Sequence, residues 1–478
     1  MPTTNGNRAI LDTPAWQFMS PAPTATVTGA FIASSPHFRQ RQLYVTSNTT
    51  AWLHNPNAGG WVATASPALA GTFGAGATGC GSAWSTGATV AAASLTATAG
   101  TTTTITTNQT LANDLRGYSV QILAGPNAGE TKTIASNSIG ANAVITFTTA
   151  SASAFSASTV YRLMTPRFYV LGAGTLAAGS FKVYDIATNT WTSLSNTGLP
   201  ATIGTDCKLI ATPSWAYADY ANFATGTATS GGASTLTVTG KTWTVNQWTN
   251  YQIRIVTGTG AGQIRTIASN TADTITVGTA WTTAPDATST YHLQGNDDFL
   301  YLIGNAAVTM YRYQISTNAW TTLSPVAARA GAPGAGVSGQ WVWGAPEADW
   351  TGESAIRNGR YIYSFRGGAS AALDRYDIAG NTWDAITYTP AGETFTTGSK
   401  YCVIDGNIYI TKEATGRWFR YNVATALMDG WHTQLYPHST AVVGDTCFDI
   451  AYFDGATKIP YIYIMLNTST VVLRAMVI

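Results

Sequence analysis

Short runs of alternating apolar and polar residues extend along the chain, and no sustained amphipathic helical pattern interrupts them. In the stretch Tyr251-Gln-Ile-Arg-Ile255 the alternation predicts a half-buried strand with one wet face. Aromatic and aliphatic residues also form six compact runs, at 42–45, 168–171, 299–303, 361–365, 407–410 and 461–464. With 47 glycines and many threonines to form turns and strands, the pattern predicts an all-β protein.

One motif occurs three times, each time after one of these aromatic-aliphatic runs. The stretch Tyr376-Asp-Ile-Ala-Gly-Asn-Thr-Trp383 is repeated at 184–191 and at 313–320, with tyrosine and tryptophan seven residues apart each time. Asparagine tolerates the left-handed backbone conformation that tight turns require. Each copy is therefore predicted to be a β-hairpin in which one strand ends at the tyrosine and the next begins at the tryptophan.

The tryptophans set a repeat of about 45–60 residues, which is the length of one four-stranded propeller blade. Further copies are centred on Trp16, Trp61 and, more loosely, Trp431. A strand of small residues begins several periods, at 29–32, 207–210, 342–344 and 447–450. The last segment, 461–478, supplies two strands but no tryptophan strand, whereas 12–21 supplies only a tryptophan strand. Six blades are expected, and the two ends should share one, which leaves no open sheet edge.

Two inserts lengthen the repeat, at 87–163 and 222–294, and they are copies of each other. Residues 128–137 align with 261–270, 133 positions later, and 117–123 align with 250–256. Each insert is expected to be a small β-barrel or sandwich of about five strands. Both should leave between the first and second strands of neighbouring blades and project side by side. The propeller would then comprise 1–86, 164–221 and 295–478.

Charge and composition exclude several classes of protein. Charged residues make up 10% of the chain, against about 25% in an average domain. The net charge of +1 offers no basic surface for nucleic acid. No apolar run approaches the ~18 residues of a membrane span, and the N-terminus has no signal-peptide pattern. We therefore expect synthesis in the cytoplasm and no nucleic-acid or membrane partner.

The residues that most often carry chemistry show no spacing that supports it. None of the five histidines lies in a metal-binding spacing, and His432 and His438, near Asp429, are expected in an ordinary loop. The cysteines Cys80, Cys207, Cys402 and Cys447 each fall in a first strand of a blade, which favours a packing role over a paired or metal-bound one. We predict no catalytic residue, no metal and no cofactor.

Two further features have a plain structural interpretation. The glycine-rich stretches 258–262 and 331–336 have strand patterns on both sides and no following helix, so hairpin turns are expected instead of nucleotide-binding loops. The acidic pairs Asp297-Asp298 and Glu347 with Asp349 fall in connecting loops. They are expected to be solvated there, and a converging glycosidase pair is the alternative.

The 16 tryptophans are the most suggestive surface candidates. Those at the repeat positions are expected to form the core between blades. The others are candidate interaction residues, because exposed aromatic side chains stack on sugars and anchor interfaces; the alternative is that they fill the core of an insert. These candidates are Trp243, Trp248, Trp281, Trp341, Trp343 and Trp350.

The Gly367-Gly368 pair, followed by tyrosine and tryptophan at fixed spacing, resembles the kelch motif, in full only at 361–383. The resemblance implies a kelch-like propeller, a fold that serves as an interaction platform, a carbohydrate-linked enzyme or a viral component. The insert pattern at 261–270, with Ile275-Thr-Val277, Trp281 and Ser289-Thr-Tyr291, resembles β-modules in structural proteins of tailed bacteriophages.

These resemblances lead to a functional expectation. The chain would be a non-enzymatic structural part of a tailed-phage virion, at the neck, tail, baseplate or capsid surface. It would be a rigid platform, present in several copies of a symmetric assembly, with other virion proteins and a host surface glycan as its partners. The alternatives are a carbohydrate-binding adhesin or polysaccharide-degrading propeller, and a cellular kelch adaptor.

Overall fold

The computed structural model describes residues 17–27, 29–34, 42–55, 60–70, 76–82, 94–204, 207–211, 224–304, 307–335, 337–343, 358–396, 399–404, 406–412, 417–431, 449–453, 457–466 and 469–476. These residues form strands, turns and bends and contain no helix, as the alternation predicts. Accordingly, the described part of the chain has no helix with the length and hydropathy of a bilayer-spanning segment.

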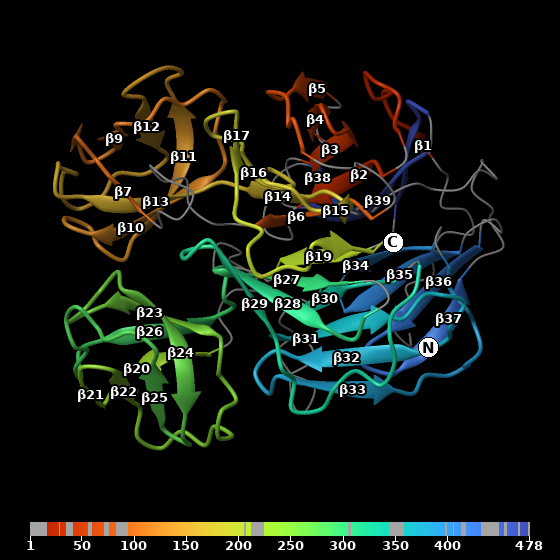
Figure 1. The fold of residues 1–478 in the computed structure, drawn as a ribbon. Helices are drawn as coiled ribbons and strands as arrows, with labels where there is room; N and C mark the ends of the chain where they lie inside the picture. Colours follow the sequence, from red (N-terminus) through yellow and green to blue (C-terminus); the bar gives the residue numbers. More distant parts are fainter. Residues whose placement is uncertain are drawn as a thin grey trace, which may run out of the picture.

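Six four-stranded antiparallel sheets form a six-bladed β-propeller (Figure 1). In chain order the blades are β2 (Phe31–Ser34), β3 (Gln42–Ser47), β4 (Thr50–Asn55), β5 (Gly60–Ala63); β6 (Thr78–Ser82), β14 (Arg167–Leu171), β16 (Phe181–Asp185), β17 (Thr190–Ser193); β19 (Lys208–Ala211), β27 (Phe299–Ile303), β28 (Met310–Gln314), β29 (Ala319–Thr322); β30 (Gln340–Trp343), β31 (Asn358–Phe365), β32 (Leu373–Asp377), β33 (Thr382–Ile386); β34 (Lys400–Ile404), β35 (Asn407–Lys412), β36 (Arg417–Asn422), β37 (Leu427–Trp431); and β38 (Asp449–Phe453), β39 (Thr457–Met465), β40 (Val472–Met476), β1 (Gln17–Phe18). All six predicted aromatic-aliphatic runs are the second strands of these blades.

The last blade is shared by the two ends of the chain, as the strand count predicts. Strand β1 pairs antiparallel with β40, with Gln17 opposite Arg474 and Phe18 opposite Leu473. The Arg474 guanidinium adds a hydrogen bond from Nε to Oε1 of Gln17 at 2.8 Å. Trp16, which marks this strand in the sequence, lies outside the described residues. The pairing closes the ring of blades and covers the sheet edge of β40.

The three Tyr–Trp hairpins each tie their blade to the one before it. In the second blade Tyr184 pairs across the strands with Trp191, and its hydroxyl donates to Oδ1 of Asn189 at 2.8 Å. Trp191 Nε1 donates to the carbonyl of Ala65, which follows the first blade, at 2.8 Å. The third blade repeats both contacts, from Tyr313 to Asn318 (2.7 Å) and from Trp320 Nε1 to the Ser195 carbonyl (3.0 Å). In the fourth blade Tyr376 again donates to Asn381 (2.7 Å), but the contact with the preceding segment is made by Asn381 Nδ2, which donates to the Ser324 carbonyl (3.0 Å). The repeated motif is thus a connector between blades.

The predicted left-handed turns are present in all three hairpins. The φ angles are 54° at Asn189, 51° at Asn318 and 46° at Asn381. The asparagine side chain accepts the tyrosine hydroxyl in each copy, so one residue provides both the backbone conformation and the hydrogen bond. The described cysteines also lie where expected: Cys80 in β6, Cys402 in β34 and Cys207 directly before β19, all three buried. Cys447 lies outside the described residues.

Between β6 and β14, and again between β19 and β27, the chain forms a seven-stranded sheet. The first insert sheet contains β7 (Leu95–Thr96), β8 (Ala99–Gly100), β9 (Thr104–Thr106), β10 (Ser119–Ala124), β11 (Thr131–Asn137), β12 (Val144–Phe147) and β13 (Val160–Met164). The second insert sheet contains β20 (Ala224–Thr227), β21 (Ser230–Gly231), β22 (Thr235–Thr237), β23 (Gln252–Thr257), β24 (Ile264–Asn270), β25 (Thr274–Val277) and β26 (Thr290–Gln294). The expectation of about five strands is therefore too low. The two shortest strands of each sheet have two or three residues, too few for an alternation to be recognised.

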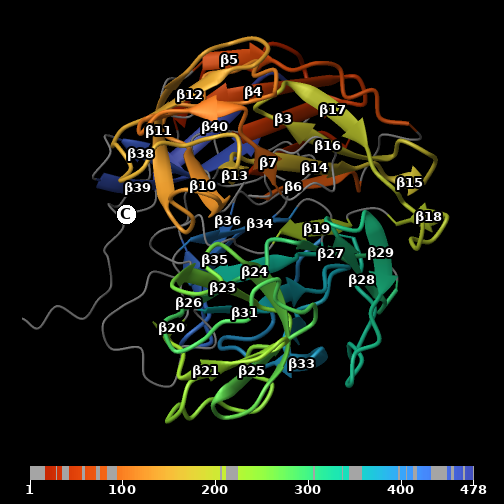
Figure 2. The ribbon, with the colours of Figure 1, turned by 90° about the vertical axis from the view of Figure 1, so that its left-hand side faces the viewer.

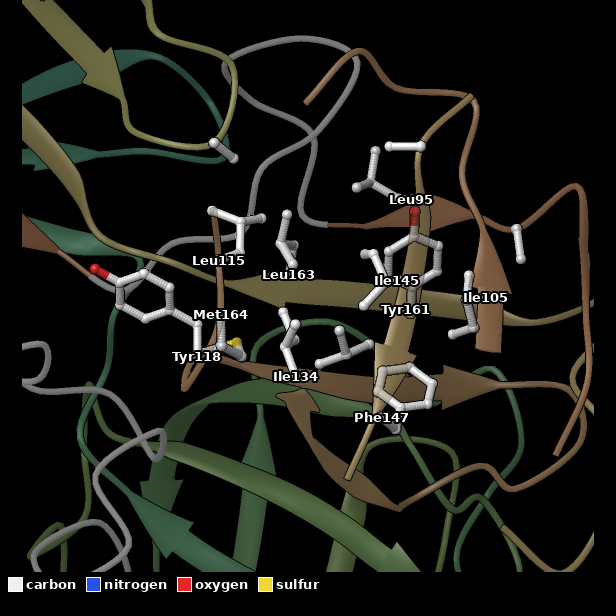
Figure 3. Close-up of a cluster of buried hydrophobic side chains, with 14 of the residues drawn as sticks. Leu95, Ile105, Leu115, Tyr118, Ile134, Ile145, Phe147, Tyr161, Leu163 and Met164 are labelled. Carbon is white, nitrogen blue, oxygen red and sulfur yellow. The ribbon is translucent and has the colours of Figure 1, made fainter. Parts of the chain in front are cut away.

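The two insert sheets have the same topology. Their strand orders are β7-β13-β10-β11-β12-β9-β8 and β20-β26-β23-β24-β25-β22-β21, which correspond strand for strand. Register shifts also match, at Ile122/Ala124 and Ile255/Thr257, 133 residues apart. Each sheet encloses its own apolar core; Figure 3 shows that of the first, where Ile134, Ile145 and Tyr161 lie together. The insert limits at 87 and 222 stay predictions, because both lie outside the described residues.

Besides the blades and inserts, the short strands β15 (Gly174–Thr175) and β18 (Thr202–Ile203) pair with each other beside the second blade. The two insert sheets lie one above the other on the same side of the propeller, in both ribbon views (Figures 1 and 2). This is the side-by-side arrangement that entry from neighbouring blades predicts.

Candidate interaction surface on the paired inserts

Both insert sheets contact the same part of the Tyr-Asp-Ile-Ala repeat, but in two different blades. Ala187 belongs to the buried core of the first insert sheet, and Ala379, its counterpart in the fourth blade, to that of the second. The carbonyl before each alanine accepts a side-chain amide hydrogen bond. The donor is Asn113 Nδ2 in the first insert (2.5 Å) and Asn250 Nδ2 in the second (3.1 Å). The repeated hairpin therefore serves as a docking site for each insert.

An aspartate shapes each of these docking turns. Asp185 accepts a hydrogen bond from the backbone N–H of Ala187 at 2.9 Å, and its other oxygen pairs with Arg167 Nε at 3.0 Å. In the fourth blade Asp377 makes the same turn bond and forms two bonds with Arg360, at 2.9 and 2.7 Å. Charge-assisted pairs of this kind hold a turn in one conformation. The Asp-Ile-Ala sequence thus prepares a fixed carbonyl and a small apolar contact for the insert.

The third blade replaces this aspartate with Gln314 and uses Asp298 instead. Oδ1 of Asp298 accepts from the backbone N–H of Ser316 at 2.7 Å, and Oδ2 accepts from the Ser316 hydroxyl at 2.6 Å and from Gln314 Nε2 at 2.9 Å. Burial raises the pKa of the Asp298 carboxyl group despite these donors. The expectation that Asp298 is solvated is therefore wrong; the side chain stabilises a buried turn.

Its neighbour Asp297 joins the first insert to the connection that follows the second insert. The carboxylate is fully buried and pairs with Arg162 Nη2, on β13 of the first insert sheet, at 2.6 Å. Asp297 itself lies in the short connection from β26 to β27. The expectation of a solvated acidic pair is thus also wrong here. A short connecting loop gave no sign of burial, because the residue that covers it is 135 positions away. An ion pair buried on both sides specifies one arrangement of its two elements.

Arg254, on β23 of the second insert sheet, contacts the first insert. Its Nη2 donates to the carbonyl of Gly129 in the first insert at 2.5 Å. With its amide oxygen turned toward the guanidinium, Gln121 accepts from Arg254 Nε at 2.6 Å and from Nη1 at 3.0 Å. Burial, together with the nearby Arg162, lowers the pKa of Arg254 to about 10. Polar groups from both inserts therefore form one buried contact.

The polar face of β23 is buried, although the alternation predicts that it is wet. Gln252 and Arg254 are each 4% exposed. Beside them Gln294 donates to Gln252 at 3.0 Å, and Gln252 donates to Asn296 at 3.0 Å. A strand pattern shows which side chains are polar but not whether another part of the chain covers them. Long polar side chains at the equivalent strand positions Gln121 and Arg254 were the available sign of a buried polar contact.

The six tryptophan candidates are not gathered on one surface. Trp248 and Trp281 are buried in the core of the second insert sheet, and Trp243 packs against that core. Two of the six are thus unavailable for stacking on a sugar in this structure. Trp341 and Trp343 lie on β30, opposite Ile362 and Asn358, and Trp350 lies outside the described residues. These last three stay predictions.

The other residues considered for chemistry, which are glycine-rich turns, histidines and acidic residues, form no catalytic or metal site among the described residues. Residues 258–262 connect the antiparallel strands β23 and β24, as expected for a hairpin turn. His432, His438, Glu347 and Asp349 lie outside the described residues. Among the residues that the structure describes, no group of three or more His, Cys, Asp or Glu side chains is placed to hold a metal ion.

Comparison with protein-family models and with curated proteins finds no match. Among solved structures, the chain is similar to YCF48 bound to a D1 peptide, with 8% sequence identity and a TM-score of 0.34, over 98% of this chain and 97% of that one. It is also similar to a chain of the mitotic checkpoint complex, with 9% identity and a TM-score of 0.35, over 98% of this chain and 95% of that one. These identities are too low to carry the role of any residue over to this chain.

Proposed function

We propose that this chain is a non-enzymatic interaction scaffold and, more specifically, a structural component of a tailed-phage particle. In this role the closed propeller is the rigid base and the two inserts are one rigid outgrowth. Its partners are neighbouring proteins of the particle, and its chemistry is limited to binding.

The observation that carries the scaffold role is that the outgrowth is fixed at three places. Each insert contacts a propeller hairpin through Asn113 or Asn250. The two inserts contact each other through Arg254 and the Gly129 carbonyl, beside the buried pair of Arg162 and Asp297. Fixed elements lose little conformational entropy when they bind, so a preorganised surface binds more tightly than a mobile one. A catalytic lid or hinged domain would need the opposite property.

The particle role is supported by features of the sequence. The chain is poor in charge and rich in Thr, Ala and Gly, and the pattern at 261–270 resembles modules of tailed-phage structural proteins. The Tyr–Trp hairpins resemble those of kelch propellers, a fold with viral members. These features favour a particle protein over a cellular adaptor.

The test is to locate the chain in particles from its source. We expect peptides of this chain in gradient-purified particles, at a fixed ratio to the capsid protein, and antibody labelling at one position in electron micrographs. Particles made without the gene should lack density at that position. If the chain is abundant in the lysate but absent from purified particles, the particle role is wrong. A glycan array probed with the purified chain tests the adhesin alternative independently.

A further inference from the structure

Two glycines at equivalent positions lie close against the opposite insert, and their contacts are reciprocal. A Cβ atom on Gly129 would lie 2.0 Å from the carbonyl oxygen of Val256, and a Cβ on Gly262 would lie 1.7 Å from that of Leu123. Gly129 and Gly262 are 133 positions apart, and so are Leu123 and Val256. Each insert thus places the same glycine on the same carbonyl of the other. Only a twofold relation between the two copies gives this reciprocity.

A second pair of residues lies on the axis of this relation. Gln121 and Arg254 are equivalent, again 133 positions apart, and they contact each other directly at 2.6 Å. A residue that contacts its own counterpart must lie on or near the twofold axis. Around this axis the pair is only approximately symmetric, because His292 stands at the position equivalent to Arg162.

The pairing does not follow from the symmetry of the propeller. The first insert docks on the hairpin of the blade from which it leaves, whereas the second docks on the hairpin of the next blade. Successive blades are related by rotation about the propeller axis, which generates head-to-tail contacts and no reciprocal ones. The twofold contact is therefore a property of the insert itself.

We infer that the insert is a self-associating module whose partner is a second copy of itself, and that this chain satisfies the pairing internally. The surface comprises β10 and β13 with the 125–130 turn in the first insert, and β23 and β26 with the 258–263 turn in the second. The inference does not depend on the particle role, because it concerns the contact between the copies and not the location of the chain.

The test is to block one copy and leave the other intact in the full-length chain. In Gly262→Arg the new side chain clashes with the Leu123 carbonyl, so the contact between the two inserts of one chain opens. The first insert keeps both Gly129 and Leu123, and its surface is complementary to the same surface of another chain. We expect a monomer for the native chain and a concentration-dependent dimer for Gly262→Arg, measured by light scattering after size exclusion.

Two variants control for other effects of this substitution. Gly240→Arg has a nearly identical backbone conformation (φ 86° against 88°) but open space around it, and it should stay monomeric. The double variant Gly129→Arg with Gly262→Arg blocks both copies and should also be monomeric. If folded Gly262→Arg stays monomeric at every concentration, or if the double variant dimerises equally, the insert is not a self-associating module.

Cysteine pairs test the symmetry without disturbing the glycines. Ala128→Cys with Val256→Cys and Ala261→Cys with Leu123→Cys are reciprocal pairs across the axis. We expect both to form a crosslink within one chain on mild oxidation, identified by peptide mapping, while single-cysteine variants form none. Crosslinking of one pair but not the other would show a head-to-tail contact and overturn the inference, even if Gly262→Arg does not fold.

Discussion

The blades and the inserts are both repeated, but their copies contact each other in opposite ways. In the second and third blades the hairpin tryptophan contacts the loop after the previous blade, as Trp320 does with Ser195, and in the fourth blade Asn381 makes the corresponding contact, so different surfaces meet at each step. The inserts place the same glycine on the same carbonyl in both directions. Head-to-tail contacts occupy the surfaces of every copy only when the copies close into a ring, whereas a reciprocal contact occupies the surfaces of both copies in a single pair. The protein therefore uses six blades but only two inserts.

The difference also shows in the chemistry of the contacts. Contacts between blades include aromatic ring pairs and neutral hydrogen bonds to backbone carbonyls, repeated with small variations. The insert contact is charged and buried, and its key ion pair occurs once. Loss of one repeated contact should lower the stability of the propeller only slightly, because equivalent contacts remain elsewhere in the ring. Loss of the single ion pair has no such compensation. The predictions below follow from this contrast.

The largest effect is expected at the buried ion pair beside the insert contact. Arg162→Ala leaves the Asp297 carboxylate buried without its ion pair, which costs about 3–5 kcal/mol when a buried pair is broken. Replacing both residues, with Arg162→Met and Asp297→Leu, should recover much of this loss. Urea unfolding followed by tryptophan fluorescence measures both. Arg116→Ala, at an exposed pair, is the control and should change stability by less than about 1 kcal/mol. An Arg162→Ala variant as stable as this control would show that the pair is not buried.

A smaller effect is expected where the inserts dock on the propeller. Ala187→Leu and Ala379→Leu overfill equivalent buried contacts, which typically costs about 1–3 kcal/mol. Each change should increase hydrogen exchange in one insert and leave the other nearly unchanged. Ala228→Leu, in the second insert core away from the docking turn, distinguishes undocking from general core disruption. Equal exchange changes in both inserts after either substitution would contradict independent docking.

At the repeated blade contact the effect should be about 1 kcal/mol. Tyr313→Phe removes the hydroxyl that donates to Asn318, and a neutral hydrogen bond contributes about 0.5–1.5 kcal/mol. Tyr184→Phe removes the same bond in the preceding blade and should cost a similar amount, because the two contacts are equivalent. Thermal unfolding of the two variants and their combination measures this. A loss above about 3 kcal/mol for one of them alone would mean that the two hairpins are not equivalent in stability.

The repeat explains which of these features could be predicted from the sequence. The Tyr–Trp spacing predicts the hairpins, the left-handed asparagines and the shared blade, because these contacts are local or recur at each period. The constant offset of 133 predicts two inserts with one topology. The buried polar contacts could not be predicted in this way: Arg162 and Asp297 are 135 positions apart, occur once and have no repeat to reveal them. Burial of Gln252 and Arg254 likewise depends on a neighbour that the strand pattern does not specify.

The smallest effect is expected from the histidine that replaces Arg162 in the second insert. His292 stands where the first insert has Arg162, and burial together with Arg254 lowers the pKa of His292. Its neutral form is therefore favoured in the folded chain, so its contribution to stability is complete above the unfolded pKa of about 6.5 and is lost as pH falls toward the folded value. Between pH 7.5 and 5.5 the melting temperature should fall slightly more for the native chain than for His292→Gln. His54→Gln, a change in the first blade, controls for histidine titration elsewhere. An identical pH response in the native chain and in His292→Gln would mean that the insert contact does not sense this protonation.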